Sequence, residues 1–395
     1  MATFSLRFLG CKVSQTDAQA IRQALQRGGH EETAGAADVA VVNTCCVTHE
    51  AVRKSRQAAS RAARTHGRVY VTGCGANLPG AFARLPENVT VVARRSEETP
   101  AAVAGDVGAI ACVQADARLE RTRAFVKIQD GCSFSCAFCV VPHVRGSSRS
   151  RSAAAVLAET RRRVRQGHRE VVLTGINLGL FRDRDAGVGL PELVREAGRT
   201  PGLARLRLSS IEVNHLTGEL VEALRETPAV GPHLHVPLQS GDDEILRAMG
   251  RRYTVASYLR KLEPLADFQL TTDVIVGFPG EDERAFAATL ETTEAAGITK
   301  VHVFPYSPRP GTATAAADTV PPDEKRERSA RLREHSHAAC LAYWHTKVGR
   351  EDVVLVDRPG RGYGADYSPW LVDAPVGELV PVRGGAVAEE GIVAV

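Results

Sequence analysis

The chain has 395 residues, of which 44% are hydrophobic and 24% are charged, and its formal net charge is +4. These values are typical of an ordinary soluble globular protein of two or three domains, and the mild positive charge permits a nucleic-acid partner without requiring one. No apolar run is long enough to cross a bilayer and no leader is apparent, so we expect no membrane contact and a cytoplasmic location. The nine cysteines then indicate metal ligands or buried thiols, and a disulfide framework is not expected.

Strands and helices alternate over residues 1–95, which we predict to form one α/β domain. Strands are expected at residues 4–9, 38–42 and 68–71, with a helix over about 16–26 and a second helix capped by Thr48. This alternation predicts an open parallel sheet with helices on both faces.

Three cysteines, Cys11, Cys45 and Cys74, each stand just past the carboxyl end of a different predicted strand. Open α/β sheets bind ligands along that edge, so the fold brings the three thiols together. We interpret them as a three-thiolate metal site with an open coordination position; the alternative is that they are buried, inert thiols. Cys46 adjoins Cys45, and because adjacent side chains of an extended chain point in opposite directions, both are not expected to bind one cluster.

A basic helix follows, with Arg53, Lys54, Arg56, Arg61 and Arg64. Such a run is most often a solvated face, although a role in binding a phosphate backbone competes with that interpretation. Residues 96–120 are rich in Ala and Gly and are predicted to be a linker.

The sequence Cys132-x3-Cys136-x2-Cys139 follows an apolar run at residues 125–128. Three thiolates at this spacing can hold three irons of a [4Fe–4S] cluster, and since the next cysteine is Cys340, one iron is left open for a ligand. A Cys3His zinc site completed by His143 is the alternative.

Residues 121–320 repeat a strand–loop–helix rhythm, with strands predicted at 125–129, 170–173, 204–208, 234–237, 272–276 and 300–304. Six such units predict a partial (β/α) barrel, open on one side, whose chemistry lies at the carboxyl ends of the strands. Small polar groups occur at those ends, in Thr174-Gly175-Ile176-Asn177, Ser209-Ser210-Ile211-Glu212, Gln239-Ser240-Gly241 and Gly277-Phe278-Pro279-Gly280.

The last part of the chain is predicted to be a charged helix over 321–345 and a small β-rich domain over 346–395. That domain has more Asp and Glu than Lys and Arg, so it is a poor counterion for phosphates. Either it binds RNA through its shape, or it mainly braces the barrel.

The flanks of the cysteine triplet, Ile128-Gln129-Asp130-Gly131 and Val141-Pro142-His143-Val144-Arg145-Gly146, resemble those of the radical S-adenosylmethionine (SAM) methylthiotransferases. Leu9-Gly10-Cys11-Lys12-Val13, Asn43-Thr44-Cys45 with Val47-Thr48, Val71-Thr72-Gly73-Cys74 and Tyr306-x-x-Arg309-Pro310-Gly311-Thr312 are similar to further signatures of that family. Among the N-terminal pair of cysteines the resemblance favours Cys45 as the ligand and leaves the role of Cys46 open. Ser14 and Gly75 depart from the family pattern, where Asn and an aromatic residue are frequent.

The resemblance implies two [4Fe–4S] clusters, one on Cys132, Cys136 and Cys139 and one on Cys11, Cys45 and Cys74. In the family the open iron chelates SAM, which is cleaved to a 5′-deoxyadenosyl radical. Cofactor contacts are implied for the following residues: Thr174, Gly175 and Asn177 at the amino-acid end, and Ser209, Ser210 and Gln239 near the ribose and adenine. Phe138 packs either on the adenine or in the core, and Arg145 and Arg149 are candidates for a substrate phosphate or the cofactor carboxylate.

The family activity is the insertion of a methylthio group into an unreactive C–H bond, which requires no side-chain base, and no catalytic acid–base set is apparent. The signatures are most similar to the branch that modifies C2 of N6-threonylcarbamoyladenosine beside the tRNA anticodon. Isopentenyladenosine in tRNA and an aspartate of a ribosomal protein are the alternative substrates, and a non-catalytic iron–sulfur or zinc RNA-binding protein is the alternative class. The expected partners are the tRNA anticodon loop and a reductant such as flavodoxin or ferredoxin.

Overall fold

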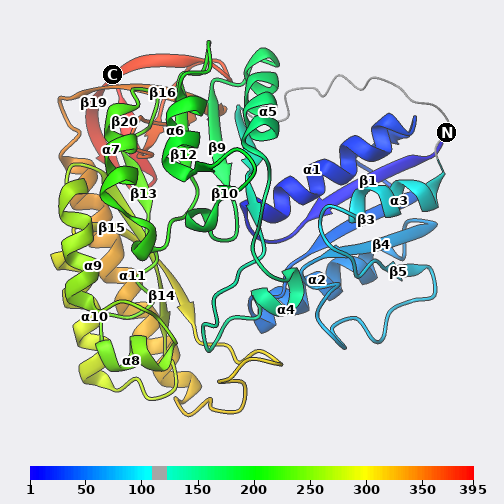
Figure 1. The fold of residues 1–395 in the computed structure, drawn as a ribbon, viewed down its shortest axis with the longest axis horizontal. Helices are drawn as coiled ribbons and strands as arrows, with labels where there is room; N and C mark the ends of the chain where they lie inside the picture. Colours follow the sequence, from blue (N-terminus) through cyan, green and yellow to red (C-terminus); the bar gives the residue numbers. More distant parts are fainter. Residues whose placement is uncertain (109–121) are drawn as a thin grey trace. The chain divides into compact units, whose positions relative to one another are not determined.

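The computed structural model describes residues 1–108 and 122–395, which form two compact units (Figure 1). The first unit contains residues 1–108, 130–149 and 307–316, and the second contains residues 122–129, 150–306 and 317–395. Residues 109–120 of the predicted linker lie outside the described residues, and its earlier part contains the helix α3 (Thr99–Val107). None of the described helices has the length and apolar character needed to span a membrane.

The first unit is built on a parallel five-stranded sheet in the order β2-β1-β3-β4-β5. Its strands are β1 (Thr3–Phe8), β2 (Glu31–Glu32), β3 (Val39–Thr44), β4 (Arg68–Gly73) and β5 (Val89–Val91). The predicted open parallel sheet is therefore confirmed. Every residue of β3 is buried, because this strand lies in the middle of the sheet with helices on both sides.

Helices cover both faces of this sheet, as predicted (Figure 1). The helix α1 (Lys12–Arg27) packs through Ile21 and Leu25, together with α3, on the face that presents Phe4 and Val41. The helix α2 (His49–Ala62) packs through Ala58 and Ala59 on the other face. The first helix begins four residues before the predicted start, since Cys11 takes the N-cap position directly after β1.

The remainder of the first unit carries the cysteine triplet. A loop over residues 131–140 leads into the short helix α4 (Val141–Arg145), whose Val144 packs with Val71 and Phe82. The strands β7 (Gln129–Asp130) and β8 (Arg149–Ser150), where the chain enters and leaves this region, form a two-stranded sheet.

The second unit contains six parallel strands in two sheets, ordered β12-β9-β6 and β13-β14-β15. Their bounds are β6 (Arg123–Lys127), β9 (Glu170–Thr174), β12 (Arg205–Leu208), β13 (His233–His235), β14 (Gln269–Val276) and β15 (Ile298–Pro305). The amide of Ile211 donates to the carbonyl of His235 at 3.0 Å, which connects the two sheets. The strands thus follow one another in sequence order, and the predicted partial barrel is confirmed.

Helices alternate with these strands and enclose one large hydrophobic core. They are α5 (Ala153–Arg165), α6 (Leu190–Gly198), α7 (Gly218–Glu226), α8 (Asp243–Ala248), α9 (Val255–Leu262) and α10 (Glu283–Ala295), with single turns at Leu178–Leu180, Val213–His215 and Glu263–Leu265. A small hairpin, β10 (Arg182–Asp183) and β11 (Val188–Gly189), precedes α6.

The chain ends in the long helix α11 (Pro322–His345) and a closed β-barrel in the order β16-β17-β18-β20-β19. Its strands are β16 (Glu351–Arg358), β17 (Arg361–Tyr363), β18 (Pro369–Leu371), β19 (Leu379–Ala388) and β20 (Gly391–Ala394). Trp370 is fully buried in its centre beside Val354 and Ile392. The predicted small β-rich domain is confirmed.

Candidate functional site

The structure brings the three N-terminal cysteines to one edge of the parallel sheet. Cys11 follows β1 and is exposed, while Cys45 follows β3 and Cys74 follows β4, with exposed fractions of 9% and 7%. Burial, and to a smaller extent the charges of the neighbouring Cys74 and Cys11, raise the pKa of Cys45 to about 11. The three thiols are therefore close enough for their charges to affect one another, as a shared binding site requires.

Cys46 also lies beside these cysteines, although adjacent side chains of an extended chain were expected to point in opposite directions. The strand β3 ends at Thr44, so Cys45 and Cys46 both lie beyond it and the alternation of side chains no longer holds. Cys46 is 1% exposed and hydrogen bonds Cys74, which raises the pKa of Cys46. Its carbonyl accepts a hydrogen bond from Arg309 Nη1 at 3.0 Å, which fixes this turn.

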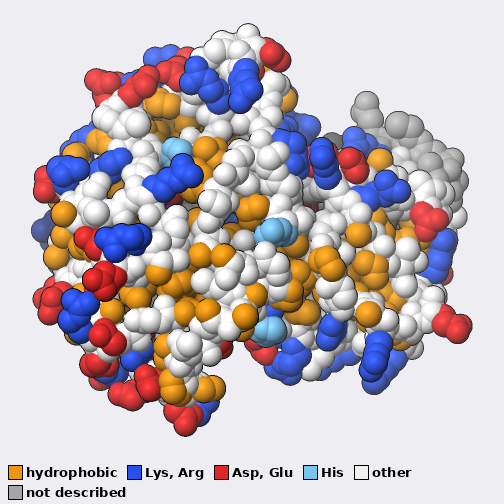
Figure 2. Space-filling model, turned by 60° about the horizontal axis from the view of Figure 1, so that its bottom comes forward, with side chains coloured by type: hydrophobic (Ala, Val, Ile, Leu, Met, Phe, Trp, Pro, Cys, Tyr) orange, Lys and Arg blue, Asp and Glu red, His pale blue; other side chains and the backbone are white. Residues whose placement is uncertain are grey.

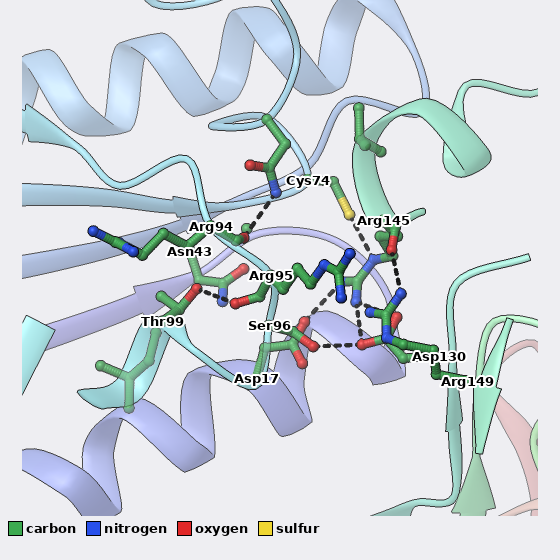
Figure 3. Close-up of a pocket in the computed structure, with 14 residues that line it drawn as sticks. Asp17, Asn43, Cys74, Arg94, Arg95, Ser96, Thr99, Asp130, Arg145 and Arg149 are labelled. Atoms are coloured by element: carbon green, nitrogen blue, oxygen red, sulfur yellow. Dashed lines mark hydrogen bonds and ion pairs between the residues drawn. The ribbon is translucent and has the colours of Figure 1, made fainter. Parts of the chain in front are cut away.

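A buried guanidinium, that of Arg145, contacts the thiol of Cys74 (Figure 3). Arg145 Nε donates to Cys74 Sγ at 2.9 Å, Nη1 donates to Asp130 Oδ1 at 2.9 Å, and Nη2 donates to Asp17 Oδ2 at 2.7 Å. A hydrogen bond from Cys46, together with the charge of Arg145, lowers the pKa of Cys74 to about 7 against the effect of burial. The thiolate is the form that binds metals, so this environment favours a metal ligand.

The expectation that Arg145 meets a substrate phosphate or the cofactor carboxylate is not what the structure shows. Its side chain is 5% exposed and its donors are directed at Cys74 and the two aspartates. Arg149 differs, because its side chain is 28% exposed and pairs with Glu97 at 3.2 Å. One signal for this network is present in the sequence: Asp17 occupies a position spaced by four residues from Val13 and Ile21 on the buried face of α1, where an acid needs a partner.

The second cysteine trio, Cys132, Cys136 and Cys139, lies on the loop before α4, and all three side chains are half-buried. The loop is held by its backbone: the amide of Cys132 donates to the carbonyl of Gly146 at 3.0 Å. The amide of Phe134 donates to Cys132 Sγ at 3.4 Å. Amide donors to thiolate sulfur are among the features that tune iron–sulfur clusters, so the loop suits a cluster ligand.

The donor chemistry of both trios fits iron–sulfur clusters. Within residues 1–108 and 122–395, no three His, Cys, Asp or Glu side chains are grouped closely enough to hold a single ion. A cubane does not require that arrangement, because each thiolate binds a different iron at a corner of the cluster. His143, the residue considered for a zinc site, lies in α4.

In the second unit, buried polar atoms without partners lie where β9 ends. Thr174 Oγ1 and Asn177 Oδ1 are buried, and neither has a hydrogen-bond partner among the described residues. The amide of Asn177 is held by Gln129 Oε1 at 2.9 Å, and a Cβ at Gly175 would be 3.0 Å from the same oxygen. Since buried polar atoms normally have partners, two unsatisfied oxygens together suit a polar ligand.

The two following strands place their polar residues at equivalent ends. Ser209 follows β12, is buried, and donates from its amide to the carbonyl of Leu173 at 3.0 Å. Ser210 is the next residue, and Gln239 follows β13 with a φ of +69°. The amide of Gln239 donates to the carbonyl of Asp273 at 2.8 Å, and the carbonyl of Gln239 accepts from the amide of Ile275 at 2.9 Å. These two hydrogen bonds hold Gln239 at its positive φ. A non-glycine residue in this region of φ is uncommon and often marks a functional site.

Two models of known families match separate parts of the chain. The model of the radical SAM superfamily matches residues 126–293, and the model described as Uncharacterized protein family UPF0004 matches residues 3–93. The chain is 32% identical to the threonylcarbamoyladenosine tRNA methylthiotransferase MtaB of Thermotoga maritima over 100% of this chain and 96% of that protein. It is 38% identical to the MtaB of Bacillus subtilis over 84% of this chain and 80% of the relative.

The chain belongs to the radical SAM methylthiotransferases. Radical SAM methylthiotransferases are SAM-dependent transferases with a [4Fe–4S] cluster. The predicted family and enzyme class are therefore confirmed, together with SAM and one [4Fe–4S] cluster as cofactors. A tRNA-2-methylthio-N(6)-dimethylallyladenosine synthase of Sphingopyxis alaskensis is also similar, with 34% identity over 96% of this chain and 94% of that protein.

Solved structures agree on the fold of this radical SAM methylthiotransferase. The radical SAM methyltransferase TsrM of Kitasatospora setae, with tryptophan and a SAM analogue bound, superposes with a TM-score of 0.59 at 16% identity, over 79% of this chain and 75% of that one. The cobalamin-dependent radical enzyme OxsB superposes with a TM-score of 0.53 at 11% identity, over 86% of this chain and 58% of that one. At these identities the likeness concerns the fold alone.

Proposed function

We propose that this enzyme adds a methylthio group to C2 of N6-threonylcarbamoyladenosine beside the anticodon of tRNA. The observation that carries this proposal is the similarity, over the whole length of the chain, to a relative named for that reaction. Two further relatives with the same name support it, at 34% and 38% identity.

The cluster that binds SAM is assigned to Cys132, Cys136 and Cys139, and a second cluster to Cys11, Cys45 and Cys74. When bound, these clusters and SAM supply the one-electron and sulfur-transfer chemistry that an unactivated C–H bond requires. The chain contributes the thiolates, the amide donor at Cys132 and the guanidinium at Cys74. A small reductant such as flavodoxin or ferredoxin would provide electrons in the cytoplasm.

The SAM molecule is assigned to the carboxyl ends of the barrel strands. Thr174, Gly175 and Asn177 would bind its amino-acid end, supported by the two unpartnered oxygens of Thr174 and Asn177 in the described structure. Ser209, Ser210 and Gln239 would bind near the ribose and adenine, supported by the unusual φ of Gln239. Phe138, on the cysteine loop, would pack against the adenine.

Basic side chains of α2 support an RNA substrate. Arg53 and Lys54 are 60% and 62% exposed, and both pair with a single acid, Glu50. Arg56, Arg61 and Arg64 are exposed farther along the same helix and the turn after it. Figure 2 shows Lys and Arg side chains, in blue, among the exposed side chains of the face in view. Such a surface suits a phosphate backbone, whose charge the acidic C-terminal barrel would repel.

A second substrate in tRNA, dimethylallyladenosine, is favoured by one observation, the 34% identity to synthases of its methylthio derivative. The two candidates are separated by mass spectrometry of nucleosides from the tRNA of a strain that lacks the gene. We expect loss of the methylthio form of N6-threonylcarbamoyladenosine and retention of the methylthio form of dimethylallyladenosine. The reverse result would replace the proposed substrate with the second one, and retention of both would reject both tRNA substrates.

Complementation of the same strain makes the experiment specific. The wild-type gene should restore the methylthio nucleoside, and Cys132→Ala should not, because it removes a ligand proposed for the cluster that binds SAM. Cys340→Ala is the matched control, since this half-buried thiol lies on α11, outside both cysteine trios. If Cys132→Ala restores the nucleoside, the assignment of Cys132 as a cluster ligand is wrong.

A further inference from the structure

The guanidinium of Arg145 occupies a special position in the first unit. Its three nitrogens point in three directions, to Cys74, to Asp130 and to Asp17, at 2.7–2.9 Å (Figure 3). The side chains of Arg145 and Asp17 are each 5% exposed, so little solvent screens these contacts. The planar guanidinium reaches these three acceptors from three separate nitrogens, whereas the three donors of a lysine would all leave a single nitrogen.

These contacts join the two cysteine trios. Asp130 precedes Cys132 by two residues, and Arg145 follows Cys139 by six, so the pair closes the base of the cysteine loop. Asp130 is held in turn by Ser96 Oγ at 2.5 Å and by the amide of Gly131 at 2.7 Å. The same guanidinium donates to Cys74, a proposed ligand of the other cluster. One side chain therefore connects the loop of Cys132, Cys136 and Cys139 to the thiol of Cys74.

A cationic donor at a ligand sulfur has a predictable effect on a cluster. Reduction adds negative charge to the cluster, and N–H···S hydrogen bonds and positive charge stabilise that charge. The effect is large when the donor is buried, because the local dielectric is low. Asp17 and Asp130 oppose the charge of Arg145, but their carboxylates face the guanidinium while its Nε–H faces the sulfur.

We propose that Arg145 is a positioning residue that fixes Cys74 against the loop of Cys132, Cys136 and Cys139 and raises the reduction potential of the N-terminal cluster. This inference rests on the proposed function, since it requires a cluster on Cys11, Cys45 and Cys74. A merely structural ion pair would stabilise the fold without changing the potential.

The test uses full-length protein with Cys132, Cys136 and Cys139 replaced by Ala, so that only the N-terminal site can bind a cluster. After anaerobic reconstitution, iron analysis should give about four irons per chain. Absence of iron would reject the N-terminal cluster itself, and the role of Arg145 with it. With iron present, a redox titration followed by electron paramagnetic resonance measures the midpoint potential of that cluster alone.

The variants are compared in a background that carries Asp17→Asn. Removing Arg145 alone would take the positive charge away from two buried carboxylates, those of Asp17 and Asp130, and the uncompensated negative charge would destabilise the fold. With Asp17→Asn present, Arg145→Met removes the donor and the cation while Asp130 keeps its bonds to Ser96 and Gly131. Arg149→Met in the same background is the matched control, since Arg149 lies four residues away and pairs with Glu97.

We expect Arg145→Met to lower the ratio of reduced to oxidised cluster at least tenfold at a fixed potential, which is about 59 mV for one electron. Arg149→Met should lower it by much less. Equal midpoints for the Asp17→Asn protein with and without Arg145→Met would overturn the proposal. An equal fall for Arg145→Met and Arg149→Met would also overturn it, because that would be a general effect of charge.

Discussion

Cys45 and Cys46 are adjacent buried thiols with different surroundings, and the difference predicts different roles. Cys45 interacts with both Cys11 and Cys74, whereas Cys46 hydrogen bonds Cys74 and has its carbonyl held by Arg309. We predict that Cys45→Ser halves the iron of the reconstituted wild-type protein, from about eight to about four per chain. Cys46→Ser should retain all of it, since it removes no ligand.

Iron analysis and the optical spectrum of the reconstituted protein check this pair. The two substitutions are chemically identical and one position apart, so a general loss of stability would affect both. Iron loss in Cys46→Ser with retention in Cys45→Ser would exchange the two roles.

The candidate ligands could be found from the sequence because each stands at a recognisable place, either in a close triplet or after a predicted strand. Arg145 could not be assigned in that way. Its partners Cys74 and Asp17 are 71 and 128 positions away in the chain, and no local pattern encodes such a contact. Near the triplet the sequence shows a basic residue, which suits a phosphate equally well, and the acid on the buried face of α1, Asp17, does not identify its partner.

At the scale of elements, the loop that bears Cys132, Cys136 and Cys139 depends on one glycine. Gly131 has a φ of +69°, and a Cβ there would collide with the carbonyl oxygens of Ser147 and Gly146. We predict that Gly131→Ala displaces the loop and abolishes the cluster proposed on its three cysteines, which iron analysis would show as a loss of about four irons.

Gly80→Ala is the matched control for this loop. Gly80 has a φ of +71°, close to that of Gly131, but a Cβ there would meet no atom within 4 Å. It therefore imposes the same backbone strain, of about 1–2 kcal/mol, without the collision. Full iron content in Gly131→Ala would show that the loop tolerates the shift and that the close contact is not essential.

The turn after β14 predicts a pH dependence of stability. Burial raises the pKa of Glu281 to about 7, although the amide of Gly277 and the charge of Arg328 lower it. The folded-state pKa thus exceeds the ordinary value of about 4.5. A group of this kind contributes most stability below its unfolded pKa, and the contribution is lost as the pH rises through 7.

We therefore expect the free energy of unfolding to fall by up to about 3 kcal/mol between about pH 5 and pH 8, as measured with denaturant. Glu281→Gln should remove this slope, because Gln carries no charge at any of these pH values. Glu283→Gln, on an exposed side chain two residues away, should leave it unchanged. A slope that persists in Glu281→Gln would assign it to another group.

Elements were predicted well where a local rule decides them. Thr48 was expected to cap a helix, and its hydroxyl does so by accepting a hydrogen bond from the amide of Ala51 at 3.1 Å. The parallel sheet with helices on both faces followed from the alternation of strands and helices. The start of α1 was misplaced because Lys12 and Ser14 gave no apolar pattern at its first turn, and because the cap is a cysteine without a side-chain hydrogen bond.

At the scale of the whole second unit, a buried charge cluster ties the C-terminal β-barrel to the partial barrel. Arg205 Nη2 donates to the carbonyl of Val353 at 2.7 Å, and Arg207 Nη1 donates to that of Ala365 at 2.9 Å. Both arginines lie on β12 and pair with Glu170 of β9, whose side chain is 1% exposed. These contacts favour the bracing role that the acidic composition of this domain left open.

Glu170 is the anion on which this connection depends. It faces Arg205 and Arg207 at 3.2 and 3.1 Å and Arg123 at 3.8 Å, and their charges hold its pKa below the ordinary value against the effect of burial. We predict that Glu170→Gln, which keeps the shape and removes the charge, destabilises the protein by about 3–5 kcal/mol, because it leaves buried cations uncompensated.

Tryptophan fluorescence during denaturant unfolding is the appropriate measurement, since the two tryptophans, Trp344 and Trp370, belong to α11 and the C-terminal barrel. Glu222→Gln is the control: this acid is 61% exposed and pairs with Arg195 on the surface, so it should cost less than about 1 kcal/mol. Both tryptophans pack in the core of the C-terminal barrel, whereas Glu170 lies on β9 of the partial barrel. An early fluorescence transition in Glu170→Gln would therefore show that the buried charge cluster couples the two barrels. An unchanged transition would mean that the C-terminal barrel folds independently of β9 and β12.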